Sequence, residues 1–258
     1  KKTAKHIDWL QDIGALLNAT TWFDRTNYFE TLPREFVADA LAIEADRMRH
    51  AFIREEDLRT EMVVVRNEFE IGENDPTDVL NTELWATAFR AHPYHHPTIG
   101  WRTDIENVPI TRLQEFYNTF YWPNNAVVTV IGDFETKKIL GLIKKFFGRH
   151  KRSPHPIPDV YTKEPKQEGE RRFVIERAGE VGMIGVGWKA PNSHHPDATP
   201  LFLVATILAH GKSSRLERLL TDGGHATGVS LHPTLLRDPG LFELYITLAP
   251  GEKHAEVE

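Results

Sequence analysis

Apolar residues recur at helical spacing through most of the first half of the chain. Between Pro33 and His50 they keep a 3.6-residue rhythm. The rhythm resumes at Glu55 and stops before Gly72 and Pro76. This pattern predicts helices over residues 4–12, 33–50, 55–71, 78–89, 111–121 and 136–147.

Runs rich in β-branched and aromatic residues predict the strands. Residues 16–22 and 26–32 flank a polar turn and predict a β-hairpin, and residues 126–131 predict a buried strand. Further strands are predicted over residues 172–177, 183–189, 228–232 and 241–248, and helices over residues 197–210 and 214–220. Hairpin strands followed by runs of helices favour an α+β fold over a doubly wound parallel sheet.

A chain of 258 residues exceeds the size at which one compact domain is the usual expectation. Residues 150–169 contain four prolines and no periodic apolar pattern, which is typical of a linker. We therefore expect an N-terminal domain at residues 1–149, a linker at residues 150–170 and a second domain at residues 171–258. Because the chain starts in a helical stretch without an initiator Met and ends at Glu258 within two turns of a new helix, we also expect an internal segment of a longer protein.

Composition excludes several classes of protein. The formal net charge is −6 and the basic residues are spread along the chain, which argues against a nucleic-acid-binding protein. No apolar run approaches the roughly 20 residues that span a bilayer, so no membrane span is expected. Cysteine is absent, so any metal site must use histidine and carboxylate ligands. The compartment stays open between periplasm and cytoplasm.

Glu61 and Glu68 are the strongest candidates for chemistry. They are seven residues apart, and two helical turns take about 7.2 residues, so they project from nearly one face of a helix. Apolar neighbours such as Val65 predict that this helix is well buried, and a buried carboxylate needs a cation, hydrogen-bond donors or a metal. Two interpretations stay open: ion pairs with arginines such as Arg25 or Arg47, or ligation of a metal.

The remaining histidines and glycines offer weaker signals. None of the thirteen histidines stands in a His-Glu-x-x-His or His-x-x-Glu-His arrangement, and prolines bracket the cluster at residues 92–97, which predicts a loop with a packing or surface role. The glycines of residues 182–187 indicate a strand, because Trp188 rather than a helix follows them. Residues 211–214 follow a helix rather than a strand, so a nucleotide phosphate site is not expected there.

Six segments, in order along nearly the whole chain, carry a family resemblance. They are Asn-Ala-Thr-Thr at 18–21, Ala-Asp-Arg-Met at 45–48, Glu-Met-Val-Val-Val-Arg-Asn-Glu at 61–68, His-Pro-Tyr at 92–94, Tyr-Trp-Pro-Asn-Asn at 121–125 and Gly-Lys-Ser-Ser-Arg-Leu at 211–216. Together they resemble the pitrilysin or insulinase family of zinc metallopeptidases, especially its bacterial, mitochondrial-processing-peptidase-like branch. The resemblance implies two similar α+β domains of the LuxS and processing-peptidase type, each a mostly antiparallel sheet packed with helices.

The same resemblance implies zinc as the cofactor, with Glu68 as its third protein ligand and Glu61 as a supporting acid. Three ligands leave an open coordination position, where zinc lowers the pKa of a bound water to about 7. In the family, a His-x-x-Glu-His helix supplies the other two ligands and the general base. That helix would fall upstream of Lys1, so no catalytic residue is expected in this chain, which alone should be inactive.

A substrate-binding strand is also implied by the resemblance. Leu17, Asn18, Ala19 and Thr20 match a family strand that lies at a sheet edge and pairs with the backbone of a peptide or unfolded protein; an ordinary hairpin strand is the alternative. The second half of the same chain, or a partner subunit, would complete the site.

The resemblance therefore predicts a zinc-dependent metalloendopeptidase whose second domain is non-catalytic. The alternative is a non-catalytic paralogue that acts as a partner or scaffold subunit. Retention of both Glu61 and Glu68 favours the peptidase.

Overall fold

The computed structural model describes residues 2–179 and 181–258. By their contacts, residues 1–66 and 102–160 form one compact unit, unit 1, and residues 67–101 and 161–258 form another, unit 2. Each unit combines helices with an antiparallel sheet, which confirms the α+β class predicted from the sequence. The domain limits expected at residues 149 and 171 stay a prediction.

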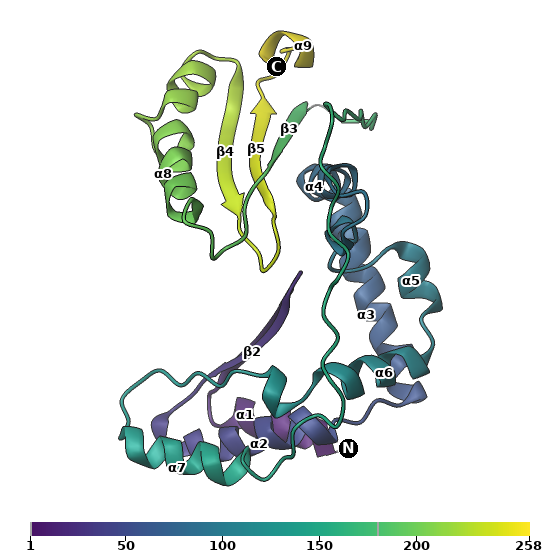
Figure 1. Ribbon diagram of the computed structural model, residues 1–258, viewed down its shortest axis with the longest axis vertical. Helices are drawn as coiled ribbons and strands as arrows, with labels where there is room; N and C mark the ends of the chain where they lie inside the picture. Colours follow the sequence, from purple (N-terminus) through teal and green to yellow (C-terminus); the bar gives the residue numbers. More distant parts are fainter. Residues whose placement is uncertain (1, 180) are drawn as a thin grey trace. The chain divides into compact units, whose positions relative to one another are not determined.

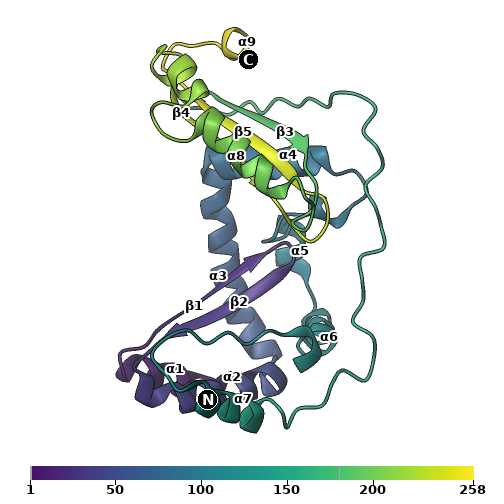
Figure 2. The ribbon, with the colours of Figure 1, turned by 60° about the vertical axis from the view of Figure 1, so that its left-hand side comes forward.

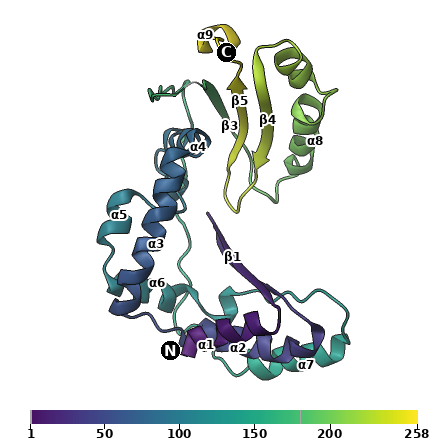
Figure 3. The ribbon, with the colours of Figure 1, turned by 180° about the vertical axis from the view of Figure 1, so that it is seen from behind.

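Unit 1 contains a layer of helices, in which α2 (Val37–His50) lies against α7 (Thr136–Phe146) (Figure 3). The apolar face of α2 buries Ala40, Leu41 and Ala45, and α7 buries Ile139. This is the burial expected of amphipathic helices. The other helices of the unit are α1 (Lys2–Asp12), η1 (Arg34–Phe36), α5 (Arg102–Asn107), α6 (Ile110–Phe120) and η3 (Pro123–Asn125).

A β-hairpin completes unit 1. Strand β1 (Leu16–Trp22) pairs antiparallel with β2 (Arg25–Thr31), and Figure 2 shows the two strands side by side. The hairpin predicted at residues 16–22 and 26–32 is confirmed, with the second strand one residue earlier than expected.

Unit 2 is built on a three-stranded antiparallel sheet of order β3-β5-β4 (Figure 1). Its strands are β3 (Met183–Lys189), β4 (Ala226–Thr234) and β5 (Leu241–Leu248). Helix α8 (Ala198–Ala209) lies beside β4, and α4 (Pro76–Ala88) packs on β3. The short helices are η2 (Pro93–His95), the π-helix η4 (Glu217–Thr221) and α9 (His254–Val257).

Glycines let α4 approach β3 closely. A Cβ atom added to Gly185 would lie 3.2 Å from Leu80 Cγ, and one added to Gly187 would lie 3.3 Å from Leu84 Cδ1. The glycine-rich segment is therefore a strand, as its sequence context predicted, and its glycines allow α4 to pack closely on it.

Helix α3 (Glu55–Asn74) runs through the point where unit 1 passes into unit 2, between Arg66 and Asn67. It begins at the predicted residue and continues three residues beyond the predicted end. Among the described residues, no helix is both long and apolar enough to cross a membrane.

Two predicted strands are wrong. Residues 126–131 and 172–177 form no strand, and their apolar side chains are open to solvent: Val127 and Ile131 are each 92 % exposed and Val174 is 79 % exposed. An apolar β-type run becomes a strand only when a neighbouring strand supplies its hydrogen bonds, and within the described residues neither segment has such a neighbour.

Candidate functional site

Glu61 and Glu68 lie on one continuous helix, α3, two turns apart as the sequence predicted. Both residues are exposed, and no residue of α3 is buried. The expectation of a buried acidic face is therefore wrong. The apolar residues of α3 do not make it a core helix, since Val63 and Val64 remain 48 % and 49 % exposed.

The ion-pair interpretation of the two acids is also wrong. Arg47 donates instead to Glu44, with 3.1 Å between Arg47 Nε and Glu44 Oε1, and Arg25 donates to Thr20 Oγ1 at 3.2 Å. Within the described part of the chain, Glu61 and Glu68 form no hydrogen bond or ion pair. Their carboxylate oxygens are therefore available to an external cation.

The donor set suits one carboxylate ligand of a metal rather than a whole site. Residues 2–179 and 181–258 contain no group of three histidine, aspartate or glutamate side chains that could hold a metal ion. A zinc site with an open position takes three protein ligands. Glu68 can supply one of these, and at least two more would have to come from elsewhere.

The matched substrate strand is open along one edge. Within the described residues β1 pairs only with β2, so its other edge has no ladder partner. Of the four matched residues, Leu17 is partly buried, and Asn18, Ala19 and Thr20 are exposed. An exposed strand edge can accept an extended peptide through main-chain hydrogen bonds.

A tyrosine pair behind the hairpin was missed in the sequence. Tyr28 of β2 and Tyr121, which caps α6, join their hydroxyls across 2.6 Å, and the Arg47 guanidinium carbon lies 3.8 Å from the centre of the Tyr28 ring. Partial burial of the ring and hydroxyl, followed by the hydrogen bond to Tyr121, raises the pKa of Tyr28. Tyr121 falls in a family-like segment, but no local signal pairs residues 93 positions apart.

A carboxyl pair lies near the same arginine. Burial, followed by the neighbouring Glu44 carboxyl, raises the pKa of Glu30 to about 7 against the opposing charge of Arg47. Desolvation and a nearby carboxylate both disfavour ionisation. Glu30 is thus poised to titrate near neutral pH.

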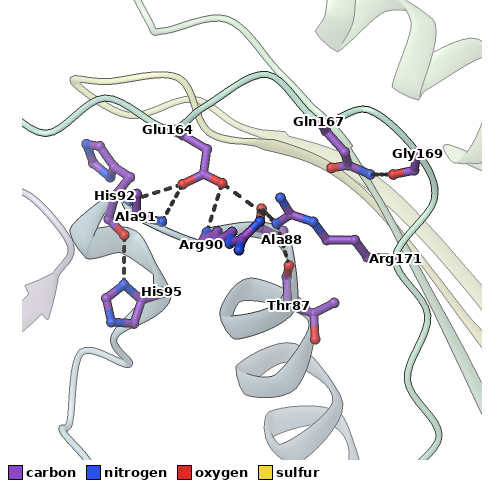
Figure 4. Close-up of polar contacts among 10 residues, drawn as sticks. All are labelled: Thr87, Ala88, Arg90, Ala91, His92, His95, Glu164, Gln167, Gly169 and Arg171. Carbon is purple, nitrogen blue, oxygen red and sulfur yellow. Dashed lines mark hydrogen bonds and ion pairs between the residues drawn. The ribbon is translucent and has the colours of Figure 1, made fainter.

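The histidine cluster at residues 92–97 is a loop of unit 2 that contains the single 3-10 turn η2, and its first histidine is packed. His92 is 4 % exposed, and its Nδ1 accepts a hydrogen bond from the Tyr94 N–H at 3.2 Å. Because Nδ1 accepts this bond, the ring proton is on Nε2, which lies 3.4 Å from Asp238 Oδ2. His95 Nδ1 in turn lies 2.8 Å from the His92 carbonyl oxygen (Figure 4).

Glu164 binds the backbone at the end of α4. Its carboxylate accepts the N–H groups of Arg90, Ala91 and His92 at 2.8, 2.8 and 3.0 Å (Figure 4). Burial alone would raise the pKa of Glu164, but these three donors outweigh it and hold the pKa below its ordinary value.

Arg171 binds the complementary groups of the same helix end. Its Nη1 donates to the carbonyls of Thr87 and Ala88, both at 2.9 Å, and lies 3.7 Å from Glu164 Oε1 (Figure 4). A cation at a helix C-terminus stabilises carbonyls that have no partner within the helix. The end of the predicted linker and the residue that follows it are therefore held on α4 by the Glu164 carboxylate and the Arg171 guanidinium, which we call the Glu164–Arg171 clamp.

Glu243 of β5 is a buried acid with many donors. It is 1 % exposed, and its Oε1 accepts from Trp85 Nε1 and the Tyr245 hydroxyl, each at 2.8 Å. Thr234 donates to Oε2, and His232 Nε2 lies 3.7 Å from the same oxygen. These contacts join α4 to the sheet and satisfy the hydrogen-bonding capacity of the carboxylate, as its burial requires. Among the described residues, no lysine or arginine pairs with it.

The chain is similar in sequence to known proteins along nearly its whole length. A sequence model described as Insulinase (Peptidase family M16) matches residues 1–101, and one described as Peptidase M16 inactive domain matches residues 107–258. The chain is 32 % identical to the zinc protease PqqE of Helicobacter pylori over 249 residues, which is 95 % of this chain and 55 % of that protein. The chain thus spans about half the length of this curated relative.

Solved structures agree on the fold. The crystal structure of a protease from Helicobacter pylori matches with a TM-score of 0.94 at 30 % identity, over 97 % of this chain and 61 % of that chain. A chain in the structure of complex III2 from Candida albicans, with Inz-5 bound, matches with a TM-score of 0.78 at 18 % identity, over 92 % of this chain and 58 % of that chain. The second likeness concerns the fold alone. With both sequence models in order along it, the chain belongs to the insulinase family of peptidases, family M16.

Proposed function

We propose that this chain is part of a zinc-dependent metalloendopeptidase that cleaves peptides or unfolded protein segments. The observation that carries the proposal is the pair of exposed carboxylates on α3, which bind no other side chain of the described residues. The zinc protease name of the Helicobacter pylori relative supports the choice of metal.

Glu68 would bind the zinc through its carboxylate. Glu61, two turns earlier on the same face, adds negative charge beside the ligand and has a supporting role. When bound, zinc polarises a carbonyl and activates a water. The two histidine ligands and the general base belong to a His-x-x-Glu-His segment that the 258 residues do not contain.

Residues 17–20 would bind the substrate. The open edge of β1 offers backbone groups to an extended chain, and such pairing tolerates many side chains. Peptides and unfolded segments fit this edge because they can adopt a strand.

Zinc content tests Glu68 directly. In a polypeptide that includes this chain and the His-x-x-Glu-His segment, we expect Glu68→Gln to lower the bound zinc well below one per chain. Glu61→Gln should weaken zinc binding about 10- to 100-fold, as is typical of groups that support a ligand. Glu55→Gln, on the same helix, is the matched control. Unchanged zinc content in Glu68→Gln would remove that residue from the site.

A second function has its own support. The alternative is a non-catalytic partner or scaffold subunit, because residues 107–258 match a sequence model described as an inactive peptidase domain. Hydrolysis of fluorescein-labelled β-casein by the longer polypeptide discriminates between them. A scaffold subunit would leave the casein intact at any zinc concentration.

A further inference from the structure

The β1–β2 hairpin has few side chains that fix its position. Six of the seven residues of β1, and six of the seven of β2, are exposed. A strand that is to accept a peptide must nevertheless present its backbone in a constant orientation, because main-chain hydrogen bonds are directional. The few contacts between the hairpin and the rest of unit 1 must therefore fix this orientation.

Tyr28 makes the most specific of these contacts. It stands directly opposite Ala19 in the ladder, so it reaches the matched substrate strand through one cross-strand pair. Its hydroxyl meets that of Tyr121 at 2.6 Å, and Tyr121 ends α6, a different element of the same unit.

Arg47 fixes the ring of Tyr28 from the side. The guanidinium stacks on that ring at 3.8 Å and is itself held by Glu44. The backbone carbonyl of Arg47 accepts the Tyr117 hydroxyl at 2.9 Å, which ties this end of α2 to α6. The hairpin is thus attached at Tyr28 to two helices that are attached to each other.

We propose that Tyr28 is a positioning residue, which through Tyr121 and Arg47 holds the β1 edge in the orientation that accepts an extended peptide. The proposal rests on the proposed function of β1. Tyr28 itself lies on the partner strand β2 and would act only through Ala19 and its neighbours. Removing either hydroxyl breaks the bond, and the hairpin then depends on the ring contacts alone.

Tyr28→Phe and Tyr121→Phe test the proposal, because each keeps the ring and removes one hydroxyl. A hydrogen bond of this kind contributes a free energy that corresponds to roughly three- to tenfold in an equilibrium constant. We expect amide hydrogen exchange in residues 16–31 to accelerate by that factor in either variant. The dissociation constant for fluorescein-labelled β-casein should rise by a similar factor, and the double variant should be no weaker than the single ones.

Tyr161→Phe is the matched control, since Tyr161 is 92 % exposed. If Tyr28→Phe behaved as Tyr161→Phe in both exchange and affinity, while the unaltered chain bound β-casein, Tyr28 would have no positioning role. Failure of the unaltered chain to bind β-casein would instead refute the peptide-binding function of β1, and the positioning role with it.

Discussion

At the scale of single residues, the buried acid Glu243 shows how this chain satisfies a polar group inside a core. Its carboxylate accepts hydrogen bonds from neutral groups, among them the indole of Trp85 and the hydroxyls of Tyr245 and Thr234. Burial, with the neighbouring carboxylate, also raises the pKa of Tyr245. The carboxylate therefore works as a hydrogen-bond acceptor that joins α4 to β5.

Glu243→Gln should destabilise the chain. The side-chain amide of glutamine has an NH2 group where the carboxylate has an oxygen, so it faces a donor and leaves that donor without an acceptor. A buried unsatisfied donor lowers the free energy of unfolding by about 1–3 kcal/mol. Urea unfolding would measure the loss. Glu256→Gln, at an exposed ion pair with Lys253, should change the free energy of unfolding very little. Equal stability of the two variants would contradict the inferred role of Glu243.

Glu30 should make the hairpin sensitive to pH. Its pKa of about 7 in the folded chain lies above the ordinary 4.5, so its stabilising contribution is fully present below about pH 4.5 and is lost as pH rises through 7. We expect the melting temperature of the parent to fall from pH 5 to pH 8 relative to Glu30→Gln, whose side chain cannot ionise. Parallel pH profiles for parent and variant would show that Glu30 does not titrate in this range.

At the scale of elements, the packing of α4 on β3 depends on residues without side chains. Gly185→Val would push a side chain into Leu80, and overpacking of this kind costs about 1–3 kcal/mol. For a protein of this size each kcal/mol lowers the melting temperature by about 2–4 °C. Gly228→Val, in β4 with open space around its Cβ position, should be tolerated. A similar fall in the melting temperature of both variants would show that the cost comes from the geometry of the strands rather than from contact with α4.

At the scale of the whole molecule, the Glu164–Arg171 clamp binds the last residues of the predicted linker to the end of α4. Arg171 is bound to two carbonyls of α4, whereas Lys151 and Arg152 are exposed and outside any helix or strand. Brief trypsin digestion should therefore cut after Lys151 or Arg152 before it cuts after Arg171. Glu164→Gln, which weakens the clamp, should hasten cleavage at Arg171. First cleavage at Arg171 in the parent would contradict this placement.

Local pattern in the sequence predicted the elements that need only their own residues. The longer helices follow from periodicity, and the hairpin and the strands β3 and β5 follow from local composition. The ordered family-like segments led to the insulinase family, which the matches over residues 1–101 and 107–258 confirm. The seven-residue spacing of Glu61 and Glu68 on one helix was likewise a local property. Zinc binding by Glu68 and peptide binding by residues 17–20 stay predictions.

Tertiary structure alone decided what depends on distant partners. It left residues 126–131 and 172–177 without a neighbouring strand, and it exposed α3 despite its valines. It also joined Tyr28 to Tyr121 and Glu164 to the end of α4, across 93 and more than 70 positions. Burial and long-range hydrogen bonds are properties of pairs of segments, so the periodicity of one segment cannot reveal them.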